Sequence, residues 1–399
     1  MRRIINWLSQ IAAVTKFGLL SIPQRGGSVG AAVFGIAGVV AVMVGVLSMG
    51  VGFRRTLDAS GSPDAAIVLR GGADSEMFSG LTLENTRIIL DAPGIARAEQ
   101  GACASPELYV IIGLPKRSTG TDANVPMRGV MQAALKVRSN LKLLQGRMFE
   151  WGKNEVIVGA GAVSQFEGLE VGGHLRIGRD NWPIVGIFST GGGTGDSEIW
   201  TDSCVLQAAY HRGSTYQSVL VKLLSPGSFP EFKAWLDADP RLNIKALRQD
   251  EYYTQQSKAV TKVINTLGYL VASLMAVGAV FGALNTMYSS VSARTREIAT
   301  LRALGFGGGA VVVSVMIEAM AVAIMGGAIG AIIAYFVFNG LETSTMSFPS
   351  FNMVTFAYAV TPDLLVQGIV WAVLIGLIGG LFPAIRGARL PIAAALREL

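Results

Sequence analysis

The chain has 399 residues, of which 51% are hydrophobic and only 15% are charged. Soluble domains contain about 25% charged residues, so this composition argues against a soluble protein. The formal net charge of +6 would suit a nucleic-acid-binding protein, but the basic residues gather in short segments beside apolar blocks, which argues against that class.

The first segment, residues 1–28, mixes large apolar residues with basic ones. Ile4, Trp7, Leu8, Ile11 and Phe17 alternate with polar residues, a pattern typical of a helix that lies in the membrane interface. We therefore expect a cytoplasmic interfacial helix here. No cleavable signal peptide is expected, because the apolar block that follows is too long and begins too far into the chain.

Four apolar blocks separated by polar sequence predict the transmembrane helices. Each is longer than the roughly 20 residues that cross the hydrocarbon core of a bilayer. The predicted spans cover residues 29–53, 263–290, 311–338 and 364–385.

The orientation follows from the Lys and Arg residues of the short connecting segments. Basic residues outnumber acidic ones before the first span, in the loop 291–310 and in the tail 386–399, whereas the loop 339–363 has no Lys or Arg. Cytoplasmic loops carry the basic excess, so both termini and the loop 291–310 are predicted to face the cytoplasm of a bacterial inner membrane. Residues 54–262 and 339–363 then lie outside.

Residues 54–262 are predicted to form a mixed α/β domain with a β-rich middle at about 116–204. Short β-type runs separated by turns indicate the strands, and Ser228 and Glu231 stand at the spacing of a capping box. Cys103 and Cys204 lie on the same oxidising side, so a disulfide between them is one open alternative. The predicted strands are 66–69, 155–158, 174–177, 182–188, 218–223 and a short one near 243–247. The predicted helices are 82–90, 230–236 and a stalk, 251–262, that continues into the second span.

The predicted spans contain small residues and few polar ones. Glu318 is the only charged residue in its block, and we expect it to act as a hydrogen-bonded or interfacial anchor instead of a proton relay. Asn285 is expected to join helices by hydrogen bonding. Pairs of glycines spaced four apart predict close helix crossings: Gly278 and Gly282, Gly326 and Gly330, and Gly376 and Gly380.

The sequence has few signs of catalysis. It contains no Walker A pattern, and its one Gly-x-Ser-x-Gly match, at residues 26–30, opens a span instead of following a strand. His174 and His211 are isolated, and no metal-binding spacing occurs. We expect no catalytic residues, no metal site and no cofactor on this chain.

The loop between the second and third spans carries a motif. It reads Ser-Ala-Arg-Thr-Arg-Glu-Ile-Ala-Thr-Leu-Arg-Ala-Leu-Gly over 292–305, and a membrane helix with Glu318 follows. This resembles the signature of ABC transporter permeases of the MacB/FtsX type. The tail from Pro383 to Arg397 is also similar to that family, although it lacks the acidic residue usual before Pro391, and Gly146-Arg147 and Asn154-Glu155 are similar to its periplasmic core.

The resemblance implies an α-helical membrane protein with four transmembrane helices and a mixed α/β extracytoplasmic domain inserted between helices 1 and 2. It also implies partners: two copies of a separate ATP-binding subunit that carries ATP and Mg, a second permease copy in a homodimer, and a periplasmic adaptor protein. The loop 291–310 would dock on the ATPase, with Ile298, Leu301 and Leu304 filling an apolar groove. The docking residues implied are Arg294, Arg296, Glu297, Ile298, Leu301, Arg302, Leu304 and Gly305.

Four functions remain open at this point. The resemblance favours export with an adaptor and an outer channel. Release of lipoproteins from the inner membrane and activation of a cell-wall hydrolase are alternatives within the same family. A membrane-anchored enzyme is the alternative from another class, and the lack of a catalytic cluster argues against it. The three arginines of the loop 291–310 could also serve only to fix topology.

Overall fold

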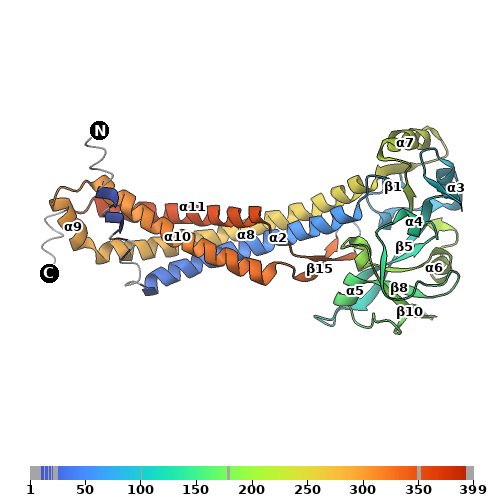
Figure 1. Cartoon of the computed structure of the whole chain (residues 1–399), viewed down its shortest axis with the longest axis horizontal. Coiled ribbons are helices and arrows are strands. Elements are labelled where there is room, and N and C mark those ends of the chain that lie inside the picture. The colour runs from blue at the N-terminus through green and yellow to red at the C-terminus, as the bar shows by residue number, and fades with distance from the viewer. Residues whose placement is uncertain are drawn as a thin grey trace. The chain divides into compact units, whose positions relative to one another are not determined.

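A computed structural model describes residues 10–12, 14–16, 18, 20, 26–99, 101–177, 180–347 and 352–391. The chain divides into two compact units (Figure 1). We call Met1–Gly50, Val263–Leu341 and Tyr358–Leu399 the membrane unit, and Val51–Lys262 with Glu342–Ala357 the sheet unit. Most of the predicted interfacial segment 1–28, and the family-like tail beyond residue 391, lie outside the described residues.

Four helices are long and apolar enough to cross a membrane, as the sequence predicts. They are α2 (Gly26–Ser60), α8 (Gln249–Ala293), α10 (Gly308–Phe338) and α11 (Pro362–Ala388). The short helix α9 (Thr295–Ala303) lies between α8 and α10 in the chain. Helix α8 is continuous over 45 residues and so includes both the predicted stalk and the predicted second span.

Two of the three predicted glycine pairs lie at close helix crossings. A Cβ atom on Gly330 of α10 would lie 2.4 Å from the carbonyl oxygen of Ala37 on α2. One on Gly376 of α11 would lie 2.5 Å from the Cβ of Ala323 on α10. Any side chain at these positions would push the helices apart, so glycine sets the helix spacing. A Cβ on Gly326 would lie 3.0 Å from the Cβ of Ile36 on α2, and one on Gly380 would lie 2.6 Å from the Cβ of Ala319 on α10.

The polar and small residues of α8 differ from the prediction. Gly278 and Gly282 have open space where a side chain would stand, so they form no crossing within this chain. Asn285 is exposed, and the interhelical hydrogen bond comes from its neighbour: Thr286 Oγ1 donates to the carbonyl of Ser28 on α2, at 3.2 Å. Successive side chains of an α-helix point about 100° apart, so Thr286 faces α2 and its neighbour Asn285 does not.

The sheet unit contains a ten-stranded sheet among its described residues, in the order β14-β1-β13-β5-β6-β11-β8-β10-β7, with β9 paired to β10. Strands β1, β13 and β14 lie outside the predicted β-rich middle, so the sheet is not confined to it. The strands are β1 (Ala65–Arg70), β5 (Ala104–Pro115), β6 (Asp122–Val130), β7 (Lys142–Gly146), β8 (Val156–Gly159), β9 (His174–Ile177), β10 (Asp180–Ser189), β11 (Ile199–Asp202), β13 (Ser218–Lys222) and β14 (Ile244–Arg248).

All six predicted strands are confirmed as β1, β8, β9, β10, β13 and β14. The predicted helices are confirmed as α3 (Leu83–Asp91) and α7 (Phe229–Ala238), but the capping box is wrong, since Ser228 makes no side-chain cap. A capping box instead begins α3, where Thr82 and Asn85 cap each other. The sheet unit also contains three short helices, α4 (Ala134–Val137), α5 (Ala160–Gln165) and α6 (Ser203–Ala209). It contains two small strand pairs as well: β2 (Leu81–Thr82) with β12 (Thr215–Tyr216), and β3 (Arg97–Ala98) with β4 (Gly101–Ala102).

The segment between α10 and α11 forms an unpredicted hairpin. Strands β15 (Glu342–Ser347) and β16 (Asn352–Ala357) pair antiparallel and belong to the sheet unit. Asn352 Nδ2 donates to the Tyr109 hydroxyl at 2.7 Å, and the Thr355 amide donates to Ser197 Oγ at 2.8 Å. The region predicted as a loop is therefore an ordered part of the extracytoplasmic domain.

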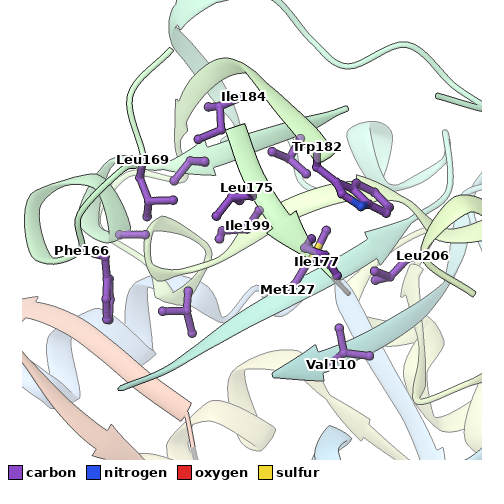
Figure 2. Close-up of a cluster of buried hydrophobic side chains, with 14 of the residues drawn as sticks. Val110, Met127, Phe166, Leu169, Leu175, Ile177, Trp182, Ile184, Ile199 and Leu206 are labelled. Atoms are coloured by element: carbon purple, nitrogen blue, oxygen red, sulfur yellow. The ribbon is translucent and has the colours of Figure 1, made fainter. Parts of the chain in front are cut away.

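The two largest apolar clusters of the sheet unit pack its strands against its helices. Figure 2 shows the one that includes Phe166, Trp182 and Leu206, which packs side chains of β5, β6 and β8–β11 with those of α5 and α6. The other packs α3 and α7 against β1, β13 and the start of β5. Strand β5 contributes to both clusters and so joins the two halves of the sheet.

Candidate functional site

The residues of the family-like loop lie around one ion pair. Arg294, between α8 and α9, places Nη1 3.2 Å from Oε2 of Glu318 on α10. Ser290 Oγ on α8 donates to the other carboxylate oxygen of Glu318 at 3.2 Å, and Arg294 Nε lies 3.1 Å from Glu297. These contacts are those of an anchor: Glu318 ties Arg294, at the start of α9, and Ser290 of α8 to α10.

Helix α9 has an inner and an outer side. Ile298 is 6% exposed and packs with Val291, Val311 and Val315, so it faces the inner side, and its docking role stays a prediction. Leu304 is 72% exposed. An apolar side chain this accessible at the end of a short helix is suited to a pocket on another protein.

The remaining docking candidates also divide between the two sides. Arg302 donates from Nη1 to the carbonyl of Leu390 at 2.6 Å, which fixes the start of the tail. Leu301 is half-buried, and Gly305 has a φ of +95°, a conformation that favours glycine and ends the helix. Arg296 and Glu297 are exposed. Some of the docking candidates therefore hold α9 in place, whereas others are exposed to solvent on its outer side.

The family-like residues of the extracytoplasmic domain form a second site. Arg147 and Glu155 make a bidentate ion pair, with both Nη–Oε distances at 2.7 Å. Gly146 has a φ of +73°, and a Cβ there would lie 2.2 Å from the carbonyl oxygen of Val185, so only glycine fits. The Gly-Arg and Asn-Glu motifs therefore pin the end of β7 to the start of β8.

This ion pair predicts a loss of stability in acid. The Arg147 guanidinium holds the pKa of Glu155 at about 2, below its usual value of 4.5. A lowered folded-state pKa stabilises the fold above pH 4.5, and that stabilisation is lost as the pH falls towards 2. Thermal melting of the full chain between pH 6 and pH 3 should therefore show a falling melting temperature. Glu155→Gln should make the melting temperature depend less on pH in this range. An unchanged dependence would contradict the role of the ion pair.

A buried charge cluster lies where β5, β6 and β11 meet. Arg128 of β6 is 2% exposed and contacts Glu76, Glu107 and Glu198 at 2.7–2.8 Å. Arg138 binds the same Glu107, which is fully buried. These five residues, which we call the Arg128 cluster, join segments that are up to 122 residues apart in the chain, from Glu76 to Glu198.

Neighbouring side chains complete the hydrogen bonding of the Arg128 cluster. Ser218 Oγ donates to Glu76 at 2.6 Å, and Trp200 Nε1 donates to Glu198 at 2.7 Å. Burial alone would raise the pKa of Glu76, but Arg128 holds it below its usual value, so the carboxylate stays charged. The sequence analysis did not find this cluster. The signal was present in the form of charged residues inside apolar strand runs, as at Glu107 and Arg128.

The remaining reactive side chains do not form a catalytic or metal site in the part of the chain that the structure describes. No group of three or more His, Cys, Asp or Glu residues is placed there to hold a metal ion. Cys103 and Cys204 are free thiols, the first buried and the second exposed, so the disulfide left open above is not formed. Sequence spacing alone could not decide this, because a disulfide needs its two Cα atoms within about 7 Å.

The fold and the site define a class of protein: a multi-pass membrane permease whose periplasmic domain is inserted between its first two spans. Residues 29–239 match the family model of the MacB-like periplasmic core domain, and residues 269–392 match that of the FtsX-like permease C-terminal. The chain belongs to this family of ABC transporter permeases.

Curated relatives agree with this assignment. The chain is 26% identical, over 98% of its length, to a "Macrolide export ATP-binding/permease protein MacB 1/2" of Paracoccus denitrificans. It is 24% identical, over 90% of its length, to such a protein of Aeromonas hydrophila. It spans 59% and 56% of those two relatives. The crystallised periplasmic region of MacB from Actinobacillus actinomycetemcomitans covers 49% of this chain and 94% of its own, at 15% identity and a TM-score of 0.36.

Proposed function

We propose that this chain is the permease subunit of an ABC transporter and transmits ATP-driven motion from a separate cytoplasmic ATPase to its periplasmic domain. ATP and Mg would be bound by that partner. The observation that carries this proposal is the construction of α9: Arg294 and Ile298 fasten it to the membrane unit, whereas Leu304 is 72% exposed. A segment that is fixed on one side and presents an apolar side chain to the solvent is suited to receive force from a docked protein.

The route from the membrane unit to the periplasmic domain is supported by two continuous helices. Helices α2 and α8 each contribute residues to both units without a break. A helix with an uninterrupted hydrogen-bond ladder is stiff enough to carry a displacement along its axis. The hairpin β15–β16, between α10 and α11, gives the periplasmic domain a further connection in the chain.

Substituting the exposed leucine of α9 tests the docking assignment. We expect Leu304→Asp to reduce ATPase binding by at least about tenfold, because a carboxylate would have to be desolvated in an apolar pocket. The measurement is the amount of ATPase that co-purifies with the tagged chain, together with its ATPase rate. Leu304→Met keeps an apolar side chain and should bind normally.

A second variant pair separates docking from general surface charge. Arg296→Glu should also weaken ATPase binding, since Arg296 lies on the exposed part of α9. Arg389→Glu makes the same change of charge on an exposed residue that directly follows α11 and should have a smaller effect. If Leu304→Asp and Arg296→Glu both bind the ATPase normally, α9 is not the docking element.

We further propose that two copies of the permease pair and that the complex exports its substrate with a periplasmic adaptor. Two features of α8 support pairing. Gly278 and Gly282 have open space beside them, and 28% of the residues in its most apolar stretch are buried, against 39–44% in the other spans. Co-expression of copies with two different tags tests this, and the absence of one tag after purification on the other would refute a homodimer. Lipoprotein release and hydrolase activation remain the alternatives, and the identity of the periplasmic partner decides among them.

A further inference from the structure

The periplasmic domain contains a groove whose lining residues play no part in the proposed function. It has a volume of about 730 Å³ and lies between α3, the β3–β4 pair and the segment that leads from β6 into α4. Sites for small molecules measure about 300–1,000 Å³, so the groove is large enough for one.

The lining of the groove is apolar with a basic margin. Leu90, Met131 and Pro106 are among the apolar residues that line it. Arg87 and Arg97 are exposed, and no ion pair is recorded for either of them among the described residues. Lys136 adds a third basic side chain, against Asp91 as the one acidic residue of the lining.

This combination selects for a particular ligand chemistry. An apolar body would remove the apolar lining from water, at about 25 cal/mol per Å² of buried surface. A negative group at one end of the ligand would pair with the two arginines, whose planar guanidinium groups match carboxylate and phosphate. A neutral ligand would leave those cations without a partner, and a cationic one would be repelled.

We propose that this groove binds an amphipathic anion, a molecule with a single apolar chain that ends in a carboxylate or a phosphate. This goes beyond the proposed function, because it gives the periplasmic domain a ligand whose binding does not depend on the ATPase. A fatty carboxylate and a single-chain phospholipid share this chemistry.

The chain contains its own reporter of the groove. Cys103 lines the groove and is 7% exposed, and Cys204 is the other cysteine of the chain. In the full chain with Cys204→Ser, held in nanodiscs of zwitterionic lipid, only Cys103 can react with N-ethylmaleimide. The rate of that reaction is measured with dodecanoate, dodecyl phosphate, dodecanol or an acidic peptide present.

We expect at least one anionic probe to slow the modification of Cys103 about fivefold, as about 80% occupancy would. The dodecanoate and dodecyl phosphate arms distinguish a carboxylate from a phosphate ligand. Arg87→Gln combined with Arg97→Gln should raise the concentration for half-protection by about tenfold or more, because charge-assisted hydrogen bonds are lost. The matched control, Arg176→Gln with Arg55→Gln, removes two exposed arginines outside the groove and should leave protection unchanged.

Other outcomes would overturn the proposal. Equal protection by dodecanol would show that charge plays no part, and protection by the acidic peptide alone would make the groove a protein-docking surface. A diazirine analogue of dodecanoate gives a readout that does not depend on thiol reactivity. Its crosslinks should fall within residues 83–106 and 131–136, and crosslinks found only elsewhere would place the ligand outside the groove.

Discussion

Arg128→Met should lower the free energy of unfolding of the periplasmic domain by about 3–5 kcal/mol, because removing one partner of a buried ion pair leaves its charge uncompensated. Arg128 is 2% exposed, and its loss would leave Glu76 and Glu198 charged in the interior without the guanidinium that both of them bind. Denaturant unfolding of the full chain, followed by the fluorescence of the buried Trp182 and Trp200, measures the change.

The control for this experiment is an exposed ion pair of the same domain. Lys233 and Asp237 lie 2.7 Å apart, with their side chains 43% and 50% exposed. Lys233→Met should cost at most about 1 kcal/mol, since water screens such pairs. If both variants lose the same stability, the Arg128 cluster does not hold the two halves of the sheet together.

The second large effect is expected at the anchor of α9. Glu318→Leu should leave the chain inserted in the membrane but reduce stimulation of the partner ATPase by about tenfold, within the usual range of coupling energies between two sites. The reason is geometric: Arg294 and Ser290 would both lose the carboxylate that joins them to α10. Insertion is measured by protease protection, and coupling by the ATPase rate of the reconstituted complex.

A double-mutant cycle separates this pair from its surroundings. If Arg294 acts through Glu318, Arg294→Met combined with Glu318→Leu should be no worse than Glu318→Leu alone. Glu318→Gln keeps a hydrogen-bond acceptor for Ser290 and should lose less than Glu318→Leu. Additive losses in the double variant would mean that the two side chains work independently.

The membrane helices and six of the ten strands in the main sheet of the periplasmic domain were predictable, because their signals are local. Apolar blocks of the required length identify α2, α8, α10 and α11 without reference to other residues. The hairpin β15–β16 was missed because its position depends on distant partners, Tyr109 and Ser197, that no local pattern reveals. The side of α8 that packs was missed for the same reason, since Thr286 instead of Asn285 meets α2.

The candidate site was predicted only in outline. The motif placed Arg294 and Glu318 in one region, and the position of Glu318 as the only charge in an apolar block marked it as an anchor. The inward orientation of Ile298 and the exposure of Leu304 depend on how α9 packs against α8 and α10, which helical spacing alone does not determine. The Arg128 cluster brings together five residues from separate segments; charged residues inside apolar strand runs hint at it, but the sequence does not show which of them pair.

Affinity purification of the tagged full chain from native membranes, with mass spectrometry of its partners, tests the central claim most directly. We predict an ABC ATPase in stoichiometric amount, lost with Leu304→Asp and kept with Leu304→Met, and a periplasmic adaptor beside it. A cell-wall hydrolase or a lipoprotein carrier in place of the adaptor would keep the coupling mechanism and change the task that it performs. If no ATPase is recovered in mild detergent, this chain is not the permease of an ATP-driven complex.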